Sequence, residues 1–398
     1  MAKTIMILGA GVFQLPAIEK ARAMGLTTVV CGGDANEAGL KLADRPHHVN
    51  TVDLDAVLNV ARSERIDGIM TIASDVSVPT VSFVAESLGL PGYGYDAAQT
   101  IQNKYSQRRA LAEKGIPCPR FGLAHTPDEA VSAAGEVGYP VIIKPLESSG
   151  SRGIAVLEDD TGIKSAFEHA AAFSTNDRGV IVEQFISGRE VGGECLIHNG
   201  RLEFIEITNK YLNPWHVPLG HSVPSTLDGG TIEAVGSCIE RCVGAFGLEN
   251  GPLNLDVMIT RDGPFVLELG ARLGGNCLPT VMALSTGVDT VKAVISMSLG
   301  ETPDLNRTGH DIIGVRILGS LYEGVLETEP DTDALRGKTG STVLEFVMDV
   351  APGEVVQRFD QGSHRFGHVI LKGDSIEGLE SDLRIIDGES AKWVKIKE

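Results

Sequence analysis

Apolar residues in the first hundred positions fall into short runs separated by amphipathic stretches. Three runs have the length and the Val/Ile content of buried parallel strands: Thr4–Leu8, Thr27–Cys31 and Asp67–Ile72. Apolar residues at helical spacing predict three helices: Phe13–Met24, Leu54–Glu64 and Val78–Leu88. This alternation of strands and helices predicts a doubly wound parallel sheet with right-handed crossovers.

The middle of the chain changes to a mixed pattern. A polar helix is predicted over Asp96–Lys114, followed by a hinge at Gly115-Ile-Pro-Cys-Pro. Residues 120–200 form a small mixed unit. Its predicted strands are Val141–Lys144, Ile154–Leu157 and Val180–Gln184, and its predicted helices are Pro127–Val137 and Thr161–Phe173. Residues 201–300 carry predicted strands at Glu203–Lys210, Leu253–Ile259 and Pro264–Leu269, and predicted helices at Thr231–Phe246 and Thr280–Leu299. The tail, 311–398, is strand-rich, with turns predicted at Pro352-Gly, Gly362 and Asp387-Gly.

The composition indicates a soluble enzyme in a reducing compartment. The chain has 398 residues, 42% of them hydrophobic, and a net charge of −19, which is unfavourable for binding nucleic acid or anionic lipid. None of its six cysteines forms a C-x-x-C pair. The N-terminal apolar run is too short for a membrane span and lacks the layout of a secretory signal. We therefore expect a cytoplasmic protein that binds neither nucleic acid nor membranes.

A glycine-rich turn, Gly9-Ala-Gly-Val-Phe-Gln14, joins the first predicted strand to the first predicted helix. A dinucleotide-binding fingerprint requires glycine at the sixth position, where this chain has Gln14. The turn therefore favours a tight connection or a small-ligand pocket over a nicotinamide or flavin site.

A strand ending in Lys144 precedes a loop of small and hydroxylated residues, Ser148-Ser-Gly-Ser-Arg-Gly153. Small residues allow backbone N–H groups to approach phosphate oxygens, and Lys144 adds a positive charge. The loop lacks the G-x-x-x-x-G-K-[ST] spacing of a Walker loop. Taken alone, the segment is either a phosphate-binding flap or a flexible hairpin with an exposed lysine.

Two further segments carry carboxylates after apolar strands. Glu183 and Glu190 are seven residues apart around Gly188, and carboxylates of this kind accept hydrogen bonds from ribose hydroxyls. A short Arg261-Asp-Gly-Pro turn predicts an antiparallel hairpin in which Asp256 and Glu268 lie side by side. Strand alternation places Leu267 and Leu269 on the face opposite Glu268. Two close carboxylates suit a hard cation such as Mg²⁺, although two solvated carboxylates on an exposed sheet remain the alternative.

Taken together and in order, these motifs resemble the ATP-grasp superfamily. The matching residues are Lys104, Lys144 with its Ser/Gly loop, Glu183, Glu190, Asp256 and Glu268-x-x-x-Arg272. The string Glu-Leu-Gly-Ala-Arg-Leu-Gly-Gly resembles the carboxylate–amine ligase branch that includes L-amino-acid ligases, with biotin carboxylase-like architecture. The resemblance implies a pre-ATP-grasp Rossmann-like domain over 1–103 and an ATP-grasp domain of two α+β subdomains over 104–310, with a lid subdomain at about 120–185. A strand-rich C-terminal subdomain covers 311–398.

The resemblance also assigns roles to individual residues. The implied ATP contacts are Lys104, Ile142, Lys144, Ser149, Gly150, Ser151, Ile154, Glu183, Ile186, Glu190, Met258 and Leu267. The two lysines contact phosphates, the Ser/Gly loop forms a lid, and the four apolar side chains sandwich adenine. Glu183 and the backbone at Ile186 hold the adenine edge, and Glu190 holds the ribose. Asp256 and Glu268 bind Mg²⁺, with Mn²⁺ as a substitute ion, and Lys144 and Arg272 act catalytically. Many members have Asn where this chain has Gly270, which implies fewer protein ligands for a second ion.

The implied reaction is an ADP-forming ligation of a carboxylate, expected to be that of an amino acid, to an amine through an acyl phosphate. Arg272 would hold the acyl phosphate, with His221 and Arg316 as further substrate contacts. A structural role remains the alternative to substrate contact for both residues: a loop histidine hydrogen-bonded to backbone for His221, and a structural ion pair for Arg316. A formyl- or carboxyl-transferring enzyme of purine or biotin type is the alternative activity, and a non-catalytic nucleotide-binding protein is another. A homodimer is a family-level expectation. His364 and His368 are not expected to form a metal pair.

Overall fold

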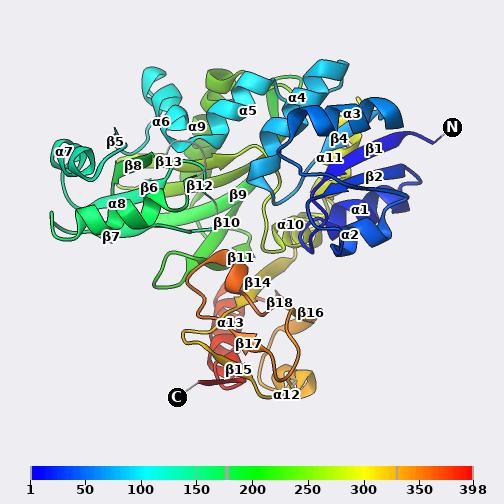
Figure 1. Ribbon diagram of the computed structural model, residues 1–398. Helices are drawn as coiled ribbons and strands as arrows, with labels where there is room; N and C mark the ends of the chain where they lie inside the picture. The colour runs from blue at the N-terminus through cyan, green and yellow to red at the C-terminus, as the bar shows by residue number, and fades with distance from the viewer. Residues whose placement is uncertain (1, 149, 175–178, 329, 397–398) are drawn as a thin grey trace.

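The computed structural model describes residues 2–148, 150–174, 179–328 and 330–396 (Figure 1). Its N-terminal part is a parallel sheet in the order β3-β2-β1-β4. The strands are β1 (Thr4–Leu8), β2 (Thr27–Gly32), β3 (Arg45–His48) and β4 (Gly68–Met70). The helices are α1 (Leu15–Ala23), α2 (Ala38–Leu42), α3 (Leu54–Glu64) and α4 (Val78–Leu88).

Alternation along β1 explains why helices cover both faces of this sheet. Ile5 and Ile7 pack with α1 and with α11 (Thr290–Ser298), whereas Met6 and Leu8 pack with α3 and α4. The prediction of a doubly wound parallel sheet is thus confirmed. The polar edge strand β3 was not predicted, because three of its four residues are exposed and show no buried pattern.

A second sheet carries the predicted lid, with four antiparallel strands in the order β5-β8-β6-β7. They are β5 (Phe121–Ala124), β6 (Val141–Pro145), β7 (Ala155–Leu157) and β8 (Val180–Gln184). Helices α7 (Pro127–Val137) and α8 (Ile163–Ala171) share one apolar core with this sheet. In Figure 1 this sheet and the N-terminal sheet lie on opposite sides of the long central strands.

The largest sheet has eight strands in the order β13-β12-β9-β10-β11-β14-β18-β16. Five come from the middle of the chain: β9 (Arg189–His198), β10 (Arg201–Leu212), β11 (Pro218–Val223), β12 (Gly251–Thr260) and β13 (Gly263–Gly270). The other three come from the tail: β14 (Ile312–Leu318), β16 (Thr342–Met348) and β18 (Gly367–Gly373). Because β11 pairs with β14, the tail continues the central sheet. Helix α9 (Gly229–Phe246) covers one face, and α10 (Leu278–Thr286) and α11 lie on the other.

Two predicted long helices are each broken into two. The predicted helix 96–114 is α5 (Tyr95–Gln102) and α6 (Lys104–Glu113), because Asn103 has extended backbone and its side chain caps α6 by accepting from Ser106 N at 3.0 Å. The predicted helix 280–299 is α10 and α11, because Gly287 ends the first with φ +76° and Asp289 caps the second. The first break makes Lys104 the first helical residue of α6.

The tail is less strand-rich than predicted. It adds a small sheet of β15 (Gly324–Leu326), β17 (Val355–Val356) and β19 (Val394–Ile396), and the helices α12 (Thr332–Arg336) and α13 (Ile376–Ser390). Asp387 lies inside α13, so the turn predicted there is wrong. The reason is that Leu379, Leu383 and Ile386 form a buried helical stripe around that position.

Within the described part of the chain, no single helix is long and apolar enough to cross a bilayer. Only α10 and α11 taken together, across a 106° bend, meet the length and composition test.

Leu196 on β9 joins the N-terminal sheet and the central sheet in one core. It is fully buried and belongs to the same apolar cluster as Ile5, Ile7 and several residues of α11. Leu196→Ala is expected to lower the free energy of unfolding by about 2–5 kcal/mol, because it leaves a cavity at this junction. Chemical denaturation measures the change. Leu321→Ala is the control, since Leu321 is 51% exposed; equal losses in both variants would contradict the assignment.

Candidate active site

One cleft of about 440 Å³ lies where the lid sheet, the central sheet and the N-terminal sheet meet. This volume is in the range typical of small-molecule sites. The predicted site residues that line it are Lys104, Ile142, Lys144, Gly150, Ser151, Ile154, Glu183, Ile186, Glu190, His221, Asp256, Met258, Leu267, Glu268 and Arg272. Ser149 lies outside the described residues. The structure therefore brings together residues that the sequence separates by up to 168 positions, from Lys104 to Arg272.

Glu183 is fully buried at the end of β8 and holds two cations. Its Oε2 lies 2.7 Å from Lys144 Nζ, and its Oε1 lies 2.6 Å from Arg108 Nε. Burial alone would raise the pKa of Glu183, but Arg108 and Lys144 lower it below its ordinary value. The carboxylate therefore fixes Lys144 at the cleft, and residues 184–186 also line it. Arg108 was not predicted, because it lies in a polar helix with no motif around it.

Lys104 connects the loop after β6 to the predicted metal ligand Glu268. Its Nζ donates to Ser148 O at 2.7 Å and lies 3.1 Å from Glu268 Oε1. Burial would raise the pKa of Glu268, but Lys104, Lys144 and Arg108 lower it to about 2. Glu268 is therefore ionised at neutral pH.

Asp256 and Glu268 are direct partners across the antiparallel pair β12 and β13, as the hairpin pattern predicts. The register shifts immediately beyond this pair, since Val257 pairs with Val266 and Leu267 has no partner. The bulge turns Leu267 toward the cleft together with Glu268. The predicted placement of Leu267 on the opposite face is thus wrong, because strict alternation does not hold across a bulge.

Lys210 on β10 has a buried side chain. The sequence predicted it as the last residue of a strand, with no role in the site. Its Nζ lies 2.7 Å from Glu190 Oε1 and 2.5 Å from Asp256 Oδ1. Burial would lower the pKa of Lys210, but Asp256 and Glu190 raise it, so it stays protonated. Burial raises the pKa of Asp256 to about 6, although Lys210 lowers it. Lys210 thus links the predicted ribose and metal ligands.

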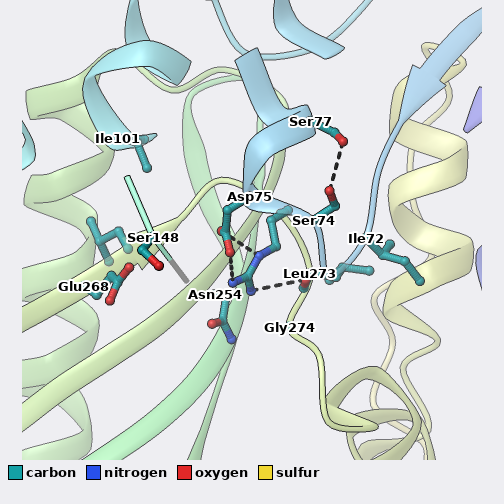
Figure 2. A network of polar contacts seen from close by, with 12 residues as sticks. Ile72, Ser74, Asp75, Ser77, Ile101, Ser148, Asn254, Glu268, Leu273 and Gly274 are labelled. Carbon is teal, nitrogen blue, oxygen red and sulfur yellow. Dashed lines mark hydrogen bonds and ion pairs between the residues drawn. The ribbon is translucent and has the colours of Figure 1, made fainter. Parts of the chain in front are cut away.

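Arg272 forms an ion pair with Asp75, which comes from the N-terminal part of the chain and is labelled in Figure 2. Arg272 Nε donates to Asp75 Oδ1 at 2.8 Å, and Nη2 donates to Oδ2 at 2.9 Å. On the other side of the turn, Gly274 N donates to Glu194 Oε1 at 2.5 Å. Burial raises the pKa of Glu194 to about 8. Neither Asp75 nor Glu194 was predicted, because each contacts its partner only through the tertiary fold.

The remaining substrate predictions have different outcomes. His221 lines the cleft, and its Nδ1 lies 2.8 Å from Thr208 Oγ1. Burial and the charge of Lys210 lower the pKa of His221 to about 3. Arg316 lies outside the cleft: it is buried on β14, with Nε 3.2 Å from Asp387 Oδ1 and its guanidinium over Tyr211. Of the two roles that the sequence left open for Arg316, the structure contains the structural ion pair.

The Ser/Gly loop after β6 contacts the tail of the chain. Gly362 N donates to Gly150 O at 3.1 Å, and Ser151 Oγ donates to His216 O at 2.9 Å. Gly362 and Ser363 also line the cleft. The described part of this loop therefore lines the cleft together with the tail segment at Gly362 and Ser363.

The side chain of Gln14 fills the space inside the glycine-rich turn after β1. Gln14 is buried and donates from Nε2 to Ile72 O at 2.8 Å. A Cβ added at Gly9 would lie 3.0 Å from Gln14 Cδ. The turn is thus a tight connection, the interpretation that the sequence favours over a dinucleotide site. His364 and His368 contact different carboxylates, Asp360 and Glu345.

The predicted metal ligands fit Mg²⁺ by their chemistry. Both are carboxylates in the cleft, on directly paired positions of two strands. The described residues contain no group of three or more His, Cys, Asp or Glu side chains that could enclose an ion. Mg²⁺ is commonly bound by one or two carboxylates together with substrate phosphates and water, which is consistent with such a site.

Comparison with known protein families agrees with this geometry. A model described as the ATP-grasp N-terminal domain matches residues 18–92, and a model described as the ATP-grasp domain matches residues 137–280. The chain belongs to the ATP-grasp superfamily. The resemblance stated from the sequence motifs is therefore confirmed, as is the predicted fold class.

Individual ATP-grasp relatives are distant but cover most of the chain. Dapdiamide A synthase of Enterobacter agglomerans is 24% identical over 81% of this chain and 78% of its own length. The formate-dependent phosphoribosylglycinamide formyltransferase of Sulfolobus acidocaldarius is 29% identical over 96% and 95%. The crystal structure of the L-amino acid ligase from Bacillus licheniformis superposes with a TM-score of 0.81 at 21% identity, over 97% of both chains. At this identity, the likeness to the solved structure establishes the fold.

Removing the charge of Glu183 tests its role as the anchor of Lys144. Glu183→Gln is expected to lower the free energy of unfolding by about 3–5 kcal/mol, because two buried cations lose their counter-charge. Chemical denaturation measures this loss, with Glu113→Gln as the control because Glu113 pairs with Arg109 on the exposed face of α6. Equal stability of the two variants would contradict a buried ion triad.

His221 is expected to remain uncharged across the physiological range. Its pKa of about 3 in the folded protein lies below the ordinary value of about 6.5, so protonation at falling pH favours the unfolded chain. The His221 ring signal in an NMR titration, identified by its absence in His221→Gln, should not shift between about pH 5 and pH 8. A midpoint near the ordinary value would show that the ring is solvated.

Proposed function

We propose that this ATP-grasp protein activates the carboxylate of an amino acid as an acyl phosphate and joins it to an amine, releasing ADP and phosphate. The observation that carries the proposal is the convergence of two lysines, two paired carboxylates and one arginine in one cleft. These groups are Lys104, Lys144, Asp256, Glu268 and Arg272. A site that only binds a nucleotide has no need of an arginine beyond the metal ligands.

The shape of the cleft supports an ordered position for ATP. Ile142, Ile154, Met258 and Leu267 give an apolar slot for adenine, and the backbone near Ile186 lies beside it. Glu190 would accept hydrogen bonds from the ribose hydroxyls. Lys104 and Lys144 would then face the phosphates, with Gly150 and Ser151 covering them.

Phosphoryl transfer depends mainly on position and charge. A carboxylate oxygen of the substrate attacks the γ-phosphorus, and the bond from that phosphorus to ADP breaks. Asp256 and Glu268 would hold Mg²⁺, which supplies neutralising charge to the phosphates when bound. Lys104 and Lys144 are already fixed by Glu268 and Glu183, so little reorganisation is required when charge develops.

The second step forms the new C–N bond. The amine nitrogen attacks the acyl carbon, the carbon–oxygen bond to phosphate breaks, and the nitrogen loses a proton. Arg272 would hold the phosphate as it leaves. Because water competes with the amine for the acyl phosphate, the cover formed by the loop at Gly150 and Ser151 protects the intermediate.

The amino-acid substrate is supported by one solved structure that is named for it, the L-amino acid ligase. Dapdiamide A synthase is a curated relative, and the L-amino acid ligase shares the fold over nearly the whole chain. His221, held neutral beside Thr208, gives a hydrogen-bonding group without charge in the same cleft. A second candidate, transfer of a formyl group to an amine, is supported by the 29% identity to the Sulfolobus formyltransferase.

An assay of ADP and phosphate release separates these functions. The protein is incubated with Mg-ATP and single L-amino acids, pairs of L-amino acids, formate or bicarbonate. Release that requires both a carboxylate and an amine supports the proposed ligase. Release with formate favours the second candidate, and release with bicarbonate favours transfer of a carboxyl group instead. No release with any mixture would contradict these enzymes in favour of a nucleotide-binding protein.

Glu268→Gln tests the predicted metal ligand. We expect kcat to fall at least about 100-fold, because the amide loses the charge that binds the cation while keeping the shape of the side chain. Glu345→Gln is the matched control, since Glu345 on β16 pairs with His368 on β18 and does not line the cleft. Near-normal turnover of Glu268→Gln, with an unchanged melting temperature, would refute the metal assignment.

A further inference from the structure

Arg272 is held along one edge of its guanidinium. The edge formed by Nε and Nη2 donates to both oxygens of Asp75, and Nη1 lies 3.4 Å from Leu273 O. A guanidinium has five N–H groups arranged as two forks, one at Nε–Nη2 and one at Nη1–Nη2. Asp75 occupies the first fork, so the second remains able to bind a planar oxyanion through two parallel N–H groups. Both residues line the cleft.

The segment that carries Asp75 is fastened to the turn that carries Arg272. Ala73 N donates to Leu273 O at 3.0 Å, and Ile72 forms a parallel bridge with Leu273. Ser77 on the same segment contacts Ser74 and Thr51 through its hydroxyl. Figure 2 shows Asp75 above the turn at Leu273 and Gly274, with Asn254 below and Glu268 to the side. The position of the Asp75 carboxylate is therefore set partly by backbone contacts of the neighbouring residues, in addition to its ion pair with Arg272.

Gly270 provides the space for this ion pair. A Cβ at position 270 would lie 3.2 Å from Asp75 Oδ1 and 3.3 Å from Arg272 Cζ. Such distances are tighter than ordinary van der Waals contact, so any side chain here would push against both partners. The carboxylate of Asp75 thus lies where a side chain of residue 270 would otherwise extend.

We propose that Asp75 is a positioning residue for Arg272, which leaves the Nη1–Nη2 fork facing the cleft for the carboxylate substrate and its acyl phosphate, and that Gly270 is required for this arrangement. The proposal rests on the proposed ligase function. A lysine at position 272 could not take this role, because its single ammonium has no second fork. The N-terminal part of the chain thereby contributes a group to the chemistry of the ATP-grasp cleft.

Steady-state kinetics of Asp75→Asn and Gly270→Ala test the proposal. With Mg-ATP, single L-amino acids and hydroxylamine as the amine, hydroxamate formation reports the acyl phosphate. We expect kcat/KM for the amino acid to fall about 10–100-fold in both variants, while KM for ATP stays unchanged. In an Arg272→Lys background, Asp75→Asn should cause little further loss, because the fork that it orients is absent.

The control is Glu301→Gln, which removes an ion pair between Lys3 and Glu301 that also joins the N-terminal sheet to a later segment but lies outside the cleft. It should leave all kinetic constants unchanged. Equal losses in the control, a rise of KM for ATP in Asp75→Asn, or full additivity with Arg272→Lys would overturn the positioning role.

A measurement without turnover separates this proposal from the ligase function. In ¹⁵N-labelled protein, the Nε–H signal of Arg272, identified by its loss in Arg272→Lys, should exchange slowly with water and should exchange fast in Asp75→Asn. An unchanged signal in Asp75→Asn overturns the proposal whatever the activity. If the signal behaves as expected and no amino acid gives hydroxamate, the positioning stands and the ligase function is contradicted.

Discussion

Buried cations and carboxylates balance one another's charge around the cleft, and this pairing joins the parts of the chain that form it. The chain has a net charge of −19, yet several cations converge at one cleft, and five of them pair with carboxylates. Lys144 and Arg108 meet at Glu183, Lys104 meets Glu268, Lys210 joins Glu190 to Asp256, and Arg272 meets Asp75. Buried charges are stable only when they are paired, so these pairs both hold the fold together and fix the groups that a nucleotide requires.

The same pairs explain why three parts of the chain are needed for one cleft. The lid sheet supplies Lys144 and Glu183, the central sheet supplies Asp256, Glu268 and Lys210, and the N-terminal part supplies Asp75. The tail adds Gly362, which meets the loop after β6, and its strands continue the central sheet through β14. Strand pairing through β9, β10, β12 and β13 sets the relative positions of Lys210, Asp256 and Glu268, and ion pairs to Glu268 and Arg272 join other parts of the chain to β13 and the turn after it.

The sequence allowed a good prediction of those features that depend on local patterns. Helices α3, α4 and α7 have the predicted bounds, and the hairpin turn at Arg261–Pro264 correctly placed Asp256 opposite Glu268. The prediction failed where long-range contacts decide. Asp75 and Arg272 are 197 positions apart, the partner of Arg316 lies on a helix that was not predicted, and the bulge at Leu267 depends on the pairing of β12 with β13. Asn103 is a residue type that commonly caps helices, but the polar helical pattern on both sides of it led to the prediction of one continuous helix.

The central claim is that the groups of this cleft act on one acyl phosphate. The decisive experiment follows oxygen transfer, with an amino acid whose carboxylate carries ¹⁸O, an amine and unlabelled Mg-ATP. If the carboxylate oxygen attacks the γ-phosphorus and the acyl–oxygen bond then breaks, one ¹⁸O atom per turnover should appear in the released phosphate. Product formation with no ¹⁸O in the phosphate would contradict the account, because the carboxylate would then have been activated by another route.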